Sequence, residues 1–134
     1  MDPHHAASRT EFDPSTLIAR LHISVSEVSA ERVVGTMPVE GNTQPYGLLH
    51  GGATAALAET LGSLGAMAHA APDGIAVGTD LTITHHRAVT EGEVTGVATP
   101  LHRGRTVASY AIAVTGPDGR LVASARLTCA IRPA

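Results

Sequence analysis

The sequence predicts an α+β fold in which a five-stranded antiparallel sheet wraps around one central helix. Residues 50–70 are almost wholly apolar, so a helix there must be covered on most of its sides. From residue 75 onward, apolar residues recur at every second position, which is typical of strands. Short glycine-containing turns separate these runs, and this favours neighbouring antiparallel strands.

The chain length predicts one domain, because 134 residues fall within the range of a single core. Residues 1–12 show no periodicity and are expected to form a flexible N-terminal segment, which leaves residues 13–134 as the domain. Asp13 is a capping residue type and Pro14 suits a first helical position. Together with apolar residues at helical spacing, they predict a short helix over residues 14–22.

Strands are predicted on both sides of the central helix. The long strand after the Pro72-Asp73-Gly74 turn should place its apolar residues on one face, namely Ile75, Val77, Leu81, Ile83 and Val89. The predicted strands cover residues 32–39, 75–89, 94–102, 107–114 and 121–131. The last four should form a meander. Because such a sheet has open edges, pairing of subunits is expected, with a homodimer as the minimum.

The bulk composition excludes several classes of partner. A formal net charge of -3 and the lack of a basic run argue against nucleic acid. The single cysteine excludes an intrachain disulfide, and without a signal-peptide pattern a cytoplasmic location is expected. The longest apolar run, around residues 51–67, contains Glu59 and is too short to span a bilayer, so no membrane partner is expected.

Glu59 is the residue of the central helix that most needs an explanation. An unpaired carboxylate in an apolar environment costs several kcal/mol, on the order of the desolvation penalty of an ion. One interpretation is a catalytic acid or base. The alternative is that the helix has one narrow wet stripe, shared by Glu59, Thr60 and Ser63.

His50-Gly51-Gly52, where the loop becomes helix, is a second candidate for function. Glycines allow close approach to the backbone, and the first N–H groups of a helix can donate to a carbonyl oxygen. The alternative interpretation is that the two glycines only allow a tight turn and that His50 is a surface residue. Gly51 and Glu59 are eight residues apart, about 12 Å along a helix, so they cannot serve one reacting carbon within one subunit. Two helices lying antiparallel across a twofold axis would bring them together.

Basic residues form the third candidate. His85-His86-Arg87 ends a predicted strand, and His102-Arg103-Gly104-Arg105 lies in the next connection. The guanidinium and imidazole groups of these segments could bind phosphates. The alternative interpretation is that these residues are only the solvated end of a strand. Adjacent histidines on a strand point to opposite faces, and no ligand set is complete, so no metal is expected.

The segments Asn42-Thr43-Gln44-Pro45-Tyr46-Gly47-Leu48-Leu49-His50-Gly51-Gly52 and Leu57-Ala58-Glu59-Thr60-Leu61-Gly62-Ser63 resemble the hotdog thioesterases of the PaaI type. They are most similar to the branch that hydrolyses 4-hydroxybenzoyl-CoA and 1,4-dihydroxy-2-naphthoyl-CoA. The similarity covers about residues 32–131 and includes Gly78, His85 to Ala88, Pro100-Leu101-His102 and Arg126-Leu127-Thr128.

The resemblance implies a role for each matching residue. Glu59 would be the nucleophile or general base, and the Gly51 amide would polarise the thioester carbonyl from the other subunit. Gln44 and His50 would orient the carbonyl and the leaving thiolate, and Ser63 would hold the attacking water. The implied substrate- and CoA-binding residues are Tyr46, Gly52, Gly78, His85, His86, Arg87, Ala88, His102, Arg103, Gly104, Arg105 and Thr106.

The function implied by the resemblance is hydrolysis of an aryl-CoA, hydroxyaryl-CoA in particular, to free acid and CoA. No cofactor is expected beyond the CoA of the substrate, and a homotetramer built as a dimer of dimers is expected. A broad-specificity acyl-CoA thioesterase is the first alternative. A hotdog dehydratase or hydratase and a non-catalytic acyl-CoA-binding protein are the others.

Overall fold

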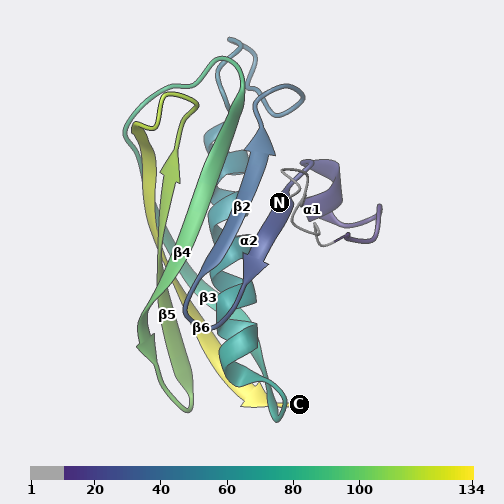
Figure 1. Cartoon of the computed structure of the whole chain (residues 1–134), viewed down its shortest axis with the longest axis vertical. Helices are drawn as coiled ribbons and strands as arrows, with labels where there is room; N and C mark the ends of the chain where they lie inside the picture. Colours follow the sequence, from purple (N-terminus) through teal and green to yellow (C-terminus); the bar gives the residue numbers. More distant parts are fainter. Residues whose placement is uncertain (1–10) are drawn as a thin grey trace, which may run out of the picture.

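The computed structural model of the chain describes residues 11–134. The elements are α1 (Leu17–Arg20), β1 (Ser24–Val28), β2 (Val33–Pro38), α2 (Gly51–Ala70), β3 (Gly74–His85), β4 (Glu93–Arg103), β5 (Val107–Thr115) and β6 (Leu121–Pro133). The sheet curls around α2 (Figure 1). The predicted antiparallel sheet around one helix is therefore confirmed. Most of the predicted N-terminal segment, residues 1–10, lies outside the described residues.

The sheet has six strands rather than the predicted five, in the order β1-β2-β4-β5-β6-β3. The additional strand is β1, which pairs with β2 through a bulged register. The predicted four-strand meander is also wrong, because β3 pairs with β6 at the far edge and β4 pairs with β2. After β3 the chain therefore crosses the end of the sheet to reach β4, and β3 is left as an edge strand.

The short N-terminal helix begins later than predicted. Thr16 caps α1 by accepting a hydrogen bond from the Ala19 N–H at 3.3 Å. Asp13 instead accepts hydrogen bonds from the backbone N–H and the hydroxyl of Ser15. The Asp13-Pro14 pair therefore forms a turn before the helix instead of its first residues.

The central helix, α2, packs closely against the sheet because glycines line the contact. Leu61 is fully buried, and a β-carbon added at Gly35 or Gly96 would lie 2.7 or 2.5 Å from its methyl groups. Gly35 and Gly96 are paired across β2 and β4, so Leu61 sits over a strip of bare backbone. None of the helices in the described part of the chain has the length and apolar character needed to cross a bilayer.

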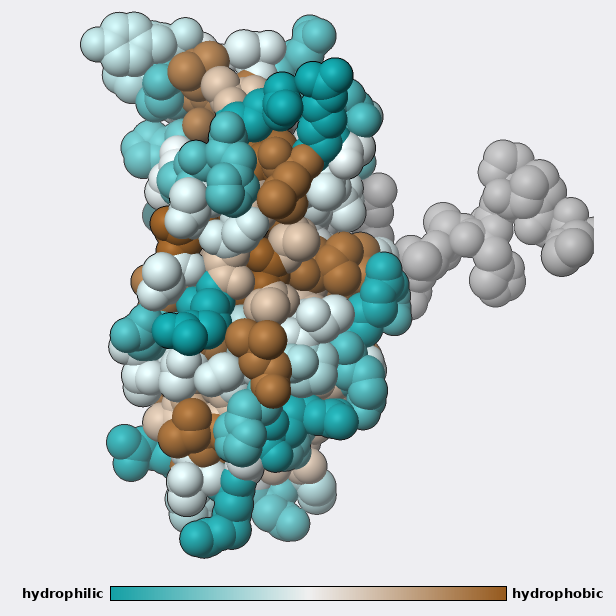
Figure 2. Space-filling model, turned by 90° about the vertical axis from the view of Figure 1, so that its left-hand side faces the viewer, coloured by the Kyte–Doolittle hydropathy of each residue, from teal (hydrophilic) through white to brown (hydrophobic). Residues whose placement is uncertain are grey.

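A bulge between Gly78 and Asp80 changes the faces of β3. The alternation predicts Ile75, Val77, Leu81 and Ile83 on one face, and this is wrong. Leu81 and Ile83 pack against the core, whereas Ile75 and Val77 are 40% and 48% exposed. The extra residue of a bulge shifts the two-residue alternation by one position, so the apolar residues before it point away from α2. The outer face of the sheet carries apolar groups among polar ones (Figure 2).

Candidate active site

The start of α2 presents one free backbone donor. His50 is the N-cap residue, and its Nδ1 accepts a hydrogen bond from the Gly52 N–H at 2.8 Å. An accepting Nδ1 carries no proton, so the neutral ring has its N–H at Nε2. The Gly51 N–H has no hydrogen-bond partner among residues 11–134. Of the two glycines, Gly51 is therefore the one whose amide can bind a carbonyl oxygen.

The loop before α2 places Gln44 beside that donor. Asn42 is buried and anchors the loop, because its side-chain amide donates to the carbonyls of Leu21 and Pro38 at 2.7 and 2.9 Å. The side-chain oxygen of Gln44 accepts a hydrogen bond from the Tyr46 N–H. The amide nitrogen of Gln44 remains available to donate. The Tyr46 side chain is 89% exposed, and it does not line the pocket that contains Gln44 and Gly51.

These donors lie at a pocket of about 400 Å³ between the loop, α2 and the segment that follows β3. Its lining residues are Gln44, Leu48, Leu49, Gly51, His85, His86, Arg87, Ala88, Val89 and Val122. The His85 ring packs against Gly51, since a β-carbon added there would lie 3.0 Å from His85 Nε2. His86 shares a hydrogen bond with the Ser124 hydroxyl at 2.9 Å. The structure thus brings six of the predicted residues to one pocket, which we call the helix-start pocket.

Glu59 lies elsewhere on α2 and is exposed. The exposed stripe that the sequence left open is present. Gly52, Glu59 and Met67 lie along a side of α2 that the sheet does not cover, whereas Thr60 and Ser63 are partly buried. A β-carbon added at Gly78 would lie 3.1 Å from Glu59 Oε1, so the carboxylate rests against bare backbone of β3. Gly78 is therefore placed beside Glu59, not in the helix-start pocket.

Ser63 and Cys129 complete the surroundings of Glu59. Cys129 is a free, fully buried cysteine on β6. Burial raises the pKa of its thiol, while the neighbouring Ser63 hydroxyl lowers it and the Glu59 carboxylate raises it to smaller extents. The proximity of Cys129 to this site was missed from the sequence, since nothing in a strand pattern indicates which residue lies under the helix.

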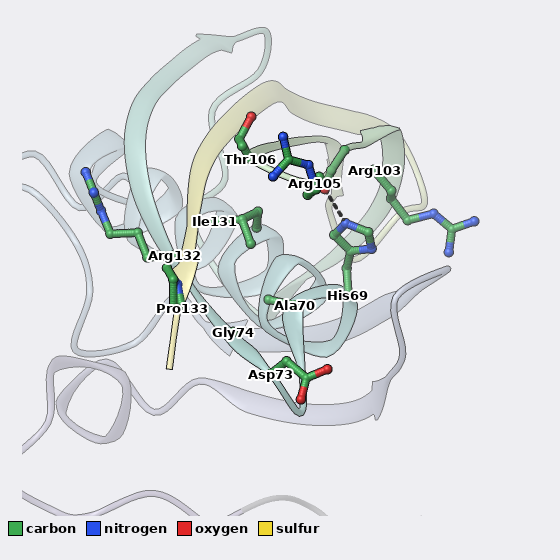
Figure 3. A pocket seen from close by; sticks show the side chains of 11 residues that line it. His69, Ala70, Asp73, Gly74, Arg103, Arg105, Thr106, Ile131, Arg132 and Pro133 are labelled. Carbon is green, nitrogen blue, oxygen red and sulfur yellow. Dashed lines mark hydrogen bonds between the residues drawn. The ribbon is translucent and has the colours of Figure 1, made fainter.

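The second group of basic residues lies at the opposite end of the molecule. His102 and Arg103 end β4, and Gly104 to Thr106 join it to β5, beside the end of α2 and the start of β3. A pocket of about 490 Å³ there is lined by Arg103, Gly104, Arg105 and Thr106, together with His69 and Arg132, which the sequence did not single out. His69 Nε2 lies 2.7 Å from the Gly104 carbonyl oxygen (Figure 3). One chain therefore does not bring the two basic groups together.

Arg103 is partly engaged within its own chain. Its guanidinium donates to Glu31 Oε1 at 2.7 Å. That hydrogen bond is the main reason the pKa of the Glu31 carboxyl lies below its ordinary value. No ion pair involves Arg105 or Arg132 within residues 11–134, so their guanidinium groups are free to meet an anion.

Comparison with known proteins identifies relatives across most of the chain. A model of the family described as the thioesterase superfamily matches residues 46–123, more than half of the chain. The proofreading thioesterase EntH of Cronobacter turicensis is 43% identical over 117 residues, which are 87% of this chain and 85% of that protein. A Deinococcus radiodurans protein, provisionally named an esterase, is 50% identical over 87% of this chain and 74% of its own length.

Solved structures agree with the fold. A thioesterase from Haemophilus influenzae superposes with a TM-score of 0.85 at 34% identity, covering 89% of this chain and 84% of that one. A Staphylococcus aureus protein, solved as a glutamate-to-alanine variant, gives a TM-score of 0.83 at 33% identity, covering 89% of this chain and 100% of that one. A glutamine-to-alanine variant of the same protein, named a thioesterase enzyme, gives a TM-score of 0.82 at 32% identity, covering 87% of this chain and 98% of that one.

Proposed function

This chain belongs to the thioesterase superfamily and is a thioester hydrolase with the hotdog fold, and we propose that it hydrolyses aryl-CoA thioesters at a site shared by two subunits. Hydroxyaryl groups are the preferred acyl groups in this proposal. The products are the free acid and CoA, and the reaction needs no metal or cofactor. The resemblance of its two motif segments to aryl-CoA thioesterases supports this substrate class.

The observation that carries the shared site is the separation of Glu59 from the carbonyl-binding donors. Glu59 is exposed halfway along α2, and the Gly51 N–H is eight residues earlier, about 12 Å along the helix axis. The open edge of β3 lies on the same side as Glu59. Antiparallel pairing of two β3 edges would set the two α2 helices antiparallel, with Glu59 of each facing the helix-start pocket of the other.

The same pairing would bring the two basic groups together. β3 begins beside the pocket of Arg105 and Arg132 and ends at His85. In an antiparallel pair, the start of one β3 lies beside the end of the other. CoA would then contact His85 to Ala88 of one subunit, and its phosphates would meet the His102 to Thr106 segment of the partner. A homodimer is the minimum unit, and a dimer of dimers is the proposed assembly.

Catalysis in this arrangement begins with polarisation of the carbonyl. The Gly51 N–H, the Gln44 amide and the His50 Nε2–H can each donate to the acyl oxygen or to the sulfur. Glu59 then either attacks the acyl carbon to form a mixed anhydride, which water hydrolyses, or takes a proton from a water that attacks directly. In both routes the carbon–sulfur bond breaks and the electron pair leaves with sulfur. Ser63, one turn after Glu59, would hold the water.

The relatives offer support for two of these residues. In the Staphylococcus aureus protein the substituted glutamate and glutamine are fifteen positions apart. Gln44 and Glu59 have the same separation here. A Pseudomonas aeruginosa thioesterase was likewise solved as a glutamine-to-alanine variant, with a TM-score of 0.81 at 35% identity over 90% of this chain and 88% of that one. The substituted pair of the Staphylococcus aureus protein therefore matches Gln44 and Glu59 in spacing.

Complementation between inactive variants tests the shared site. Glu59→Ala and Gln44→Ala should each reduce release of free CoA by orders of magnitude. Coexpressed in equal amounts, they should recover about a quarter of wild-type activity, because half of the dimers are mixed and each mixed dimer keeps one intact site of two. Glu59→Ala mixed with itself is the matched control. Full activity of Glu59→Ala, or no recovery in the mixture, would contradict the proposal.

Two further measurements define the chemistry and the substrate. Single turnover in oxygen-18 water distinguishes the routes, since label incorporated into Glu59 requires the anhydride. A panel of aryl-CoA and alkyl-CoA esters, followed by thiol release, tests the acyl preference. Equal kcat/KM across the panel would replace the aryl proposal with a broad acyl-CoA thioesterase.

A further inference from the structure

His85 stands apart from the other imidazoles of the helix-start pocket. It is the last residue of β3, it is exposed, and its ring faces Gly51. A β-carbon added at Gly51 would lie 3.0 Å from Nε2 and 3.2 Å from Cε1 of that ring. The edge of the ring therefore lies directly beside the residue whose N–H is free.

The neighbouring histidines are engaged by other groups. His50 Nδ1 is occupied by the Gly52 N–H, and His86 Nε2 is occupied by the Ser124 hydroxyl. Among residues 11–134, the histidine rings that take part in hydrogen bonds are those of His50, His69 and His86, and neither ring nitrogen of His85 has a partner. An imidazole with both nitrogens open, at the wall of a substrate pocket, can present an N–H to a bound group without losing an existing bond.

We propose that His85 is a further catalytic residue, whose ring N–H donates a hydrogen bond to the sulfur of the departing thiolate. This inference rests on the proposed function, in which the Gly51 N–H holds the acyl oxygen. The sulfur is bonded to the same carbon as that oxygen, so it also lies near Gly51. When the carbon–sulfur bond breaks, the electron pair moves to sulfur and the His85 N–H stabilises the new charge. The proton stays on the ring, and the thiolate is protonated later by water.

Leaving groups of different acidity test this role. The substrates are three thioesters of one aryl acid, formed with CoA, with N-acetylcysteamine and with thiophenol. His85→Ala should lower kcat for the CoA and N-acetylcysteamine esters about 10- to 100-fold, the loss of one hydrogen bond to a charged group. It should lower kcat for the thiophenol ester less than about threefold, because an aromatic thiolate leaves with little assistance. His85→Gln, which keeps a donor, should recover most of the loss.

Each alternative gives a different result. If His85→Ala raises KM for the CoA ester and leaves the N-acetylcysteamine ester unaffected, His85 contacts the CoA phosphates and the proposal fails. Equal losses for all three esters would also overturn it. An unfolded fraction of the variant lowers all three rates equally, so it cannot imitate the expected pattern. Glu59→Ala measured in parallel keeps the outcomes distinguishable, since its full activity would refute the proposed function whatever His85→Ala does.

Discussion

The packing of Leu61 over Gly96 allows a quantitative test of how α2 is held against the sheet. A β-carbon added at Gly96 would lie 2.5 Å from Leu61 Cδ1, whereas favourable carbon–carbon contacts are about 3.5–4.0 Å. Gly96→Ala therefore overlaps Leu61 by about 1 Å. Such overpacking lowers the free energy of unfolding by about 1–3 kcal/mol. The lower backbone entropy of alanine in the unfolded chain offsets roughly 0.5–1 kcal/mol of this.

Leu61→Ala removes the side chain that causes the overlap. Alone, it should lower the free energy of unfolding by about 2–5 kcal/mol, since Leu61 is fully buried. In that background, the new methyl group at residue 96 has Leu57 as its nearest remaining contact, at 3.6 Å. Gly96→Ala should therefore destabilise the wild-type chain and stabilise the Leu61→Ala chain. The expected coupling free energy is about 1–3 kcal/mol.

Urea unfolding followed by circular dichroism measures this cycle, with all variants at one subunit concentration because association also stabilises the fold. Gly35→Ala is the matched control. A β-carbon there would also lie 3.0 Å from the Ser24 carbonyl oxygen, so Leu61→Ala relieves only part of its overlap. If Gly96→Ala lowers stability equally in both backgrounds, the described contact between α2 and the sheet is wrong.

Three other contacts give independent predictions. His50→Ala removes the cap of α2 and should lower stability by about 0.5–2 kcal/mol in thermal unfolding, whereas His50→Asn should retain it; equal losses would contradict the capping role. The pKa of Glu31 is lowered chiefly by Arg103, so the stabilisation from this group is present above the ordinary value of 4.5 and is lost as pH falls through the lowered pKa. Arg103→Met should raise that pKa in an NMR titration, and an unchanged titration would refute the pair. Because burial raises the pKa of the Cys129 thiol, a thiol reagent should modify it only after unfolding, and rapid reaction of the native protein would contradict its burial.

The sequence predicted the central helix and five of the strands because their hydrophobic periods are long and regular. β1 was missed because it is short, with only two valines among five residues, and its register is bulged. The position of β3 at the edge of the sheet, beside β6, could not be predicted from the hydrophobic pattern either. Strand periodicity reports which side chains share a face, and it contains no information on which strand is the neighbour.

The candidate site was predicted in its residues and only partly in its arrangement. Glu59 was identified because a carboxylate among apolar residues is conspicuous, but the sequence left open whether it lies on an exposed stripe. An apolar helix face covered by its own sheet and one left open for another subunit have the same sequence pattern. The contact between His85 and Gly51 depends on where β3 ends relative to the start of α2, which only the folded chain fixes.

The bulge in β3 explains both the largest error in the predicted strand and the location of Glu59. Its extra residue turns Leu81 and Ile83 toward the core and Ile75 and Val77 outward, so no uninterrupted alternation could describe this strand. The residue at the bulge that faces α2 is Gly78, and any side chain there would meet Glu59 Oε1. Bulges of edge strands are typical next to active sites, where they interrupt pairing and redirect side chains. Here the irregularity leaves open backbone beside the carboxylate, on the edge where a second subunit would supply the carbonyl-binding donors.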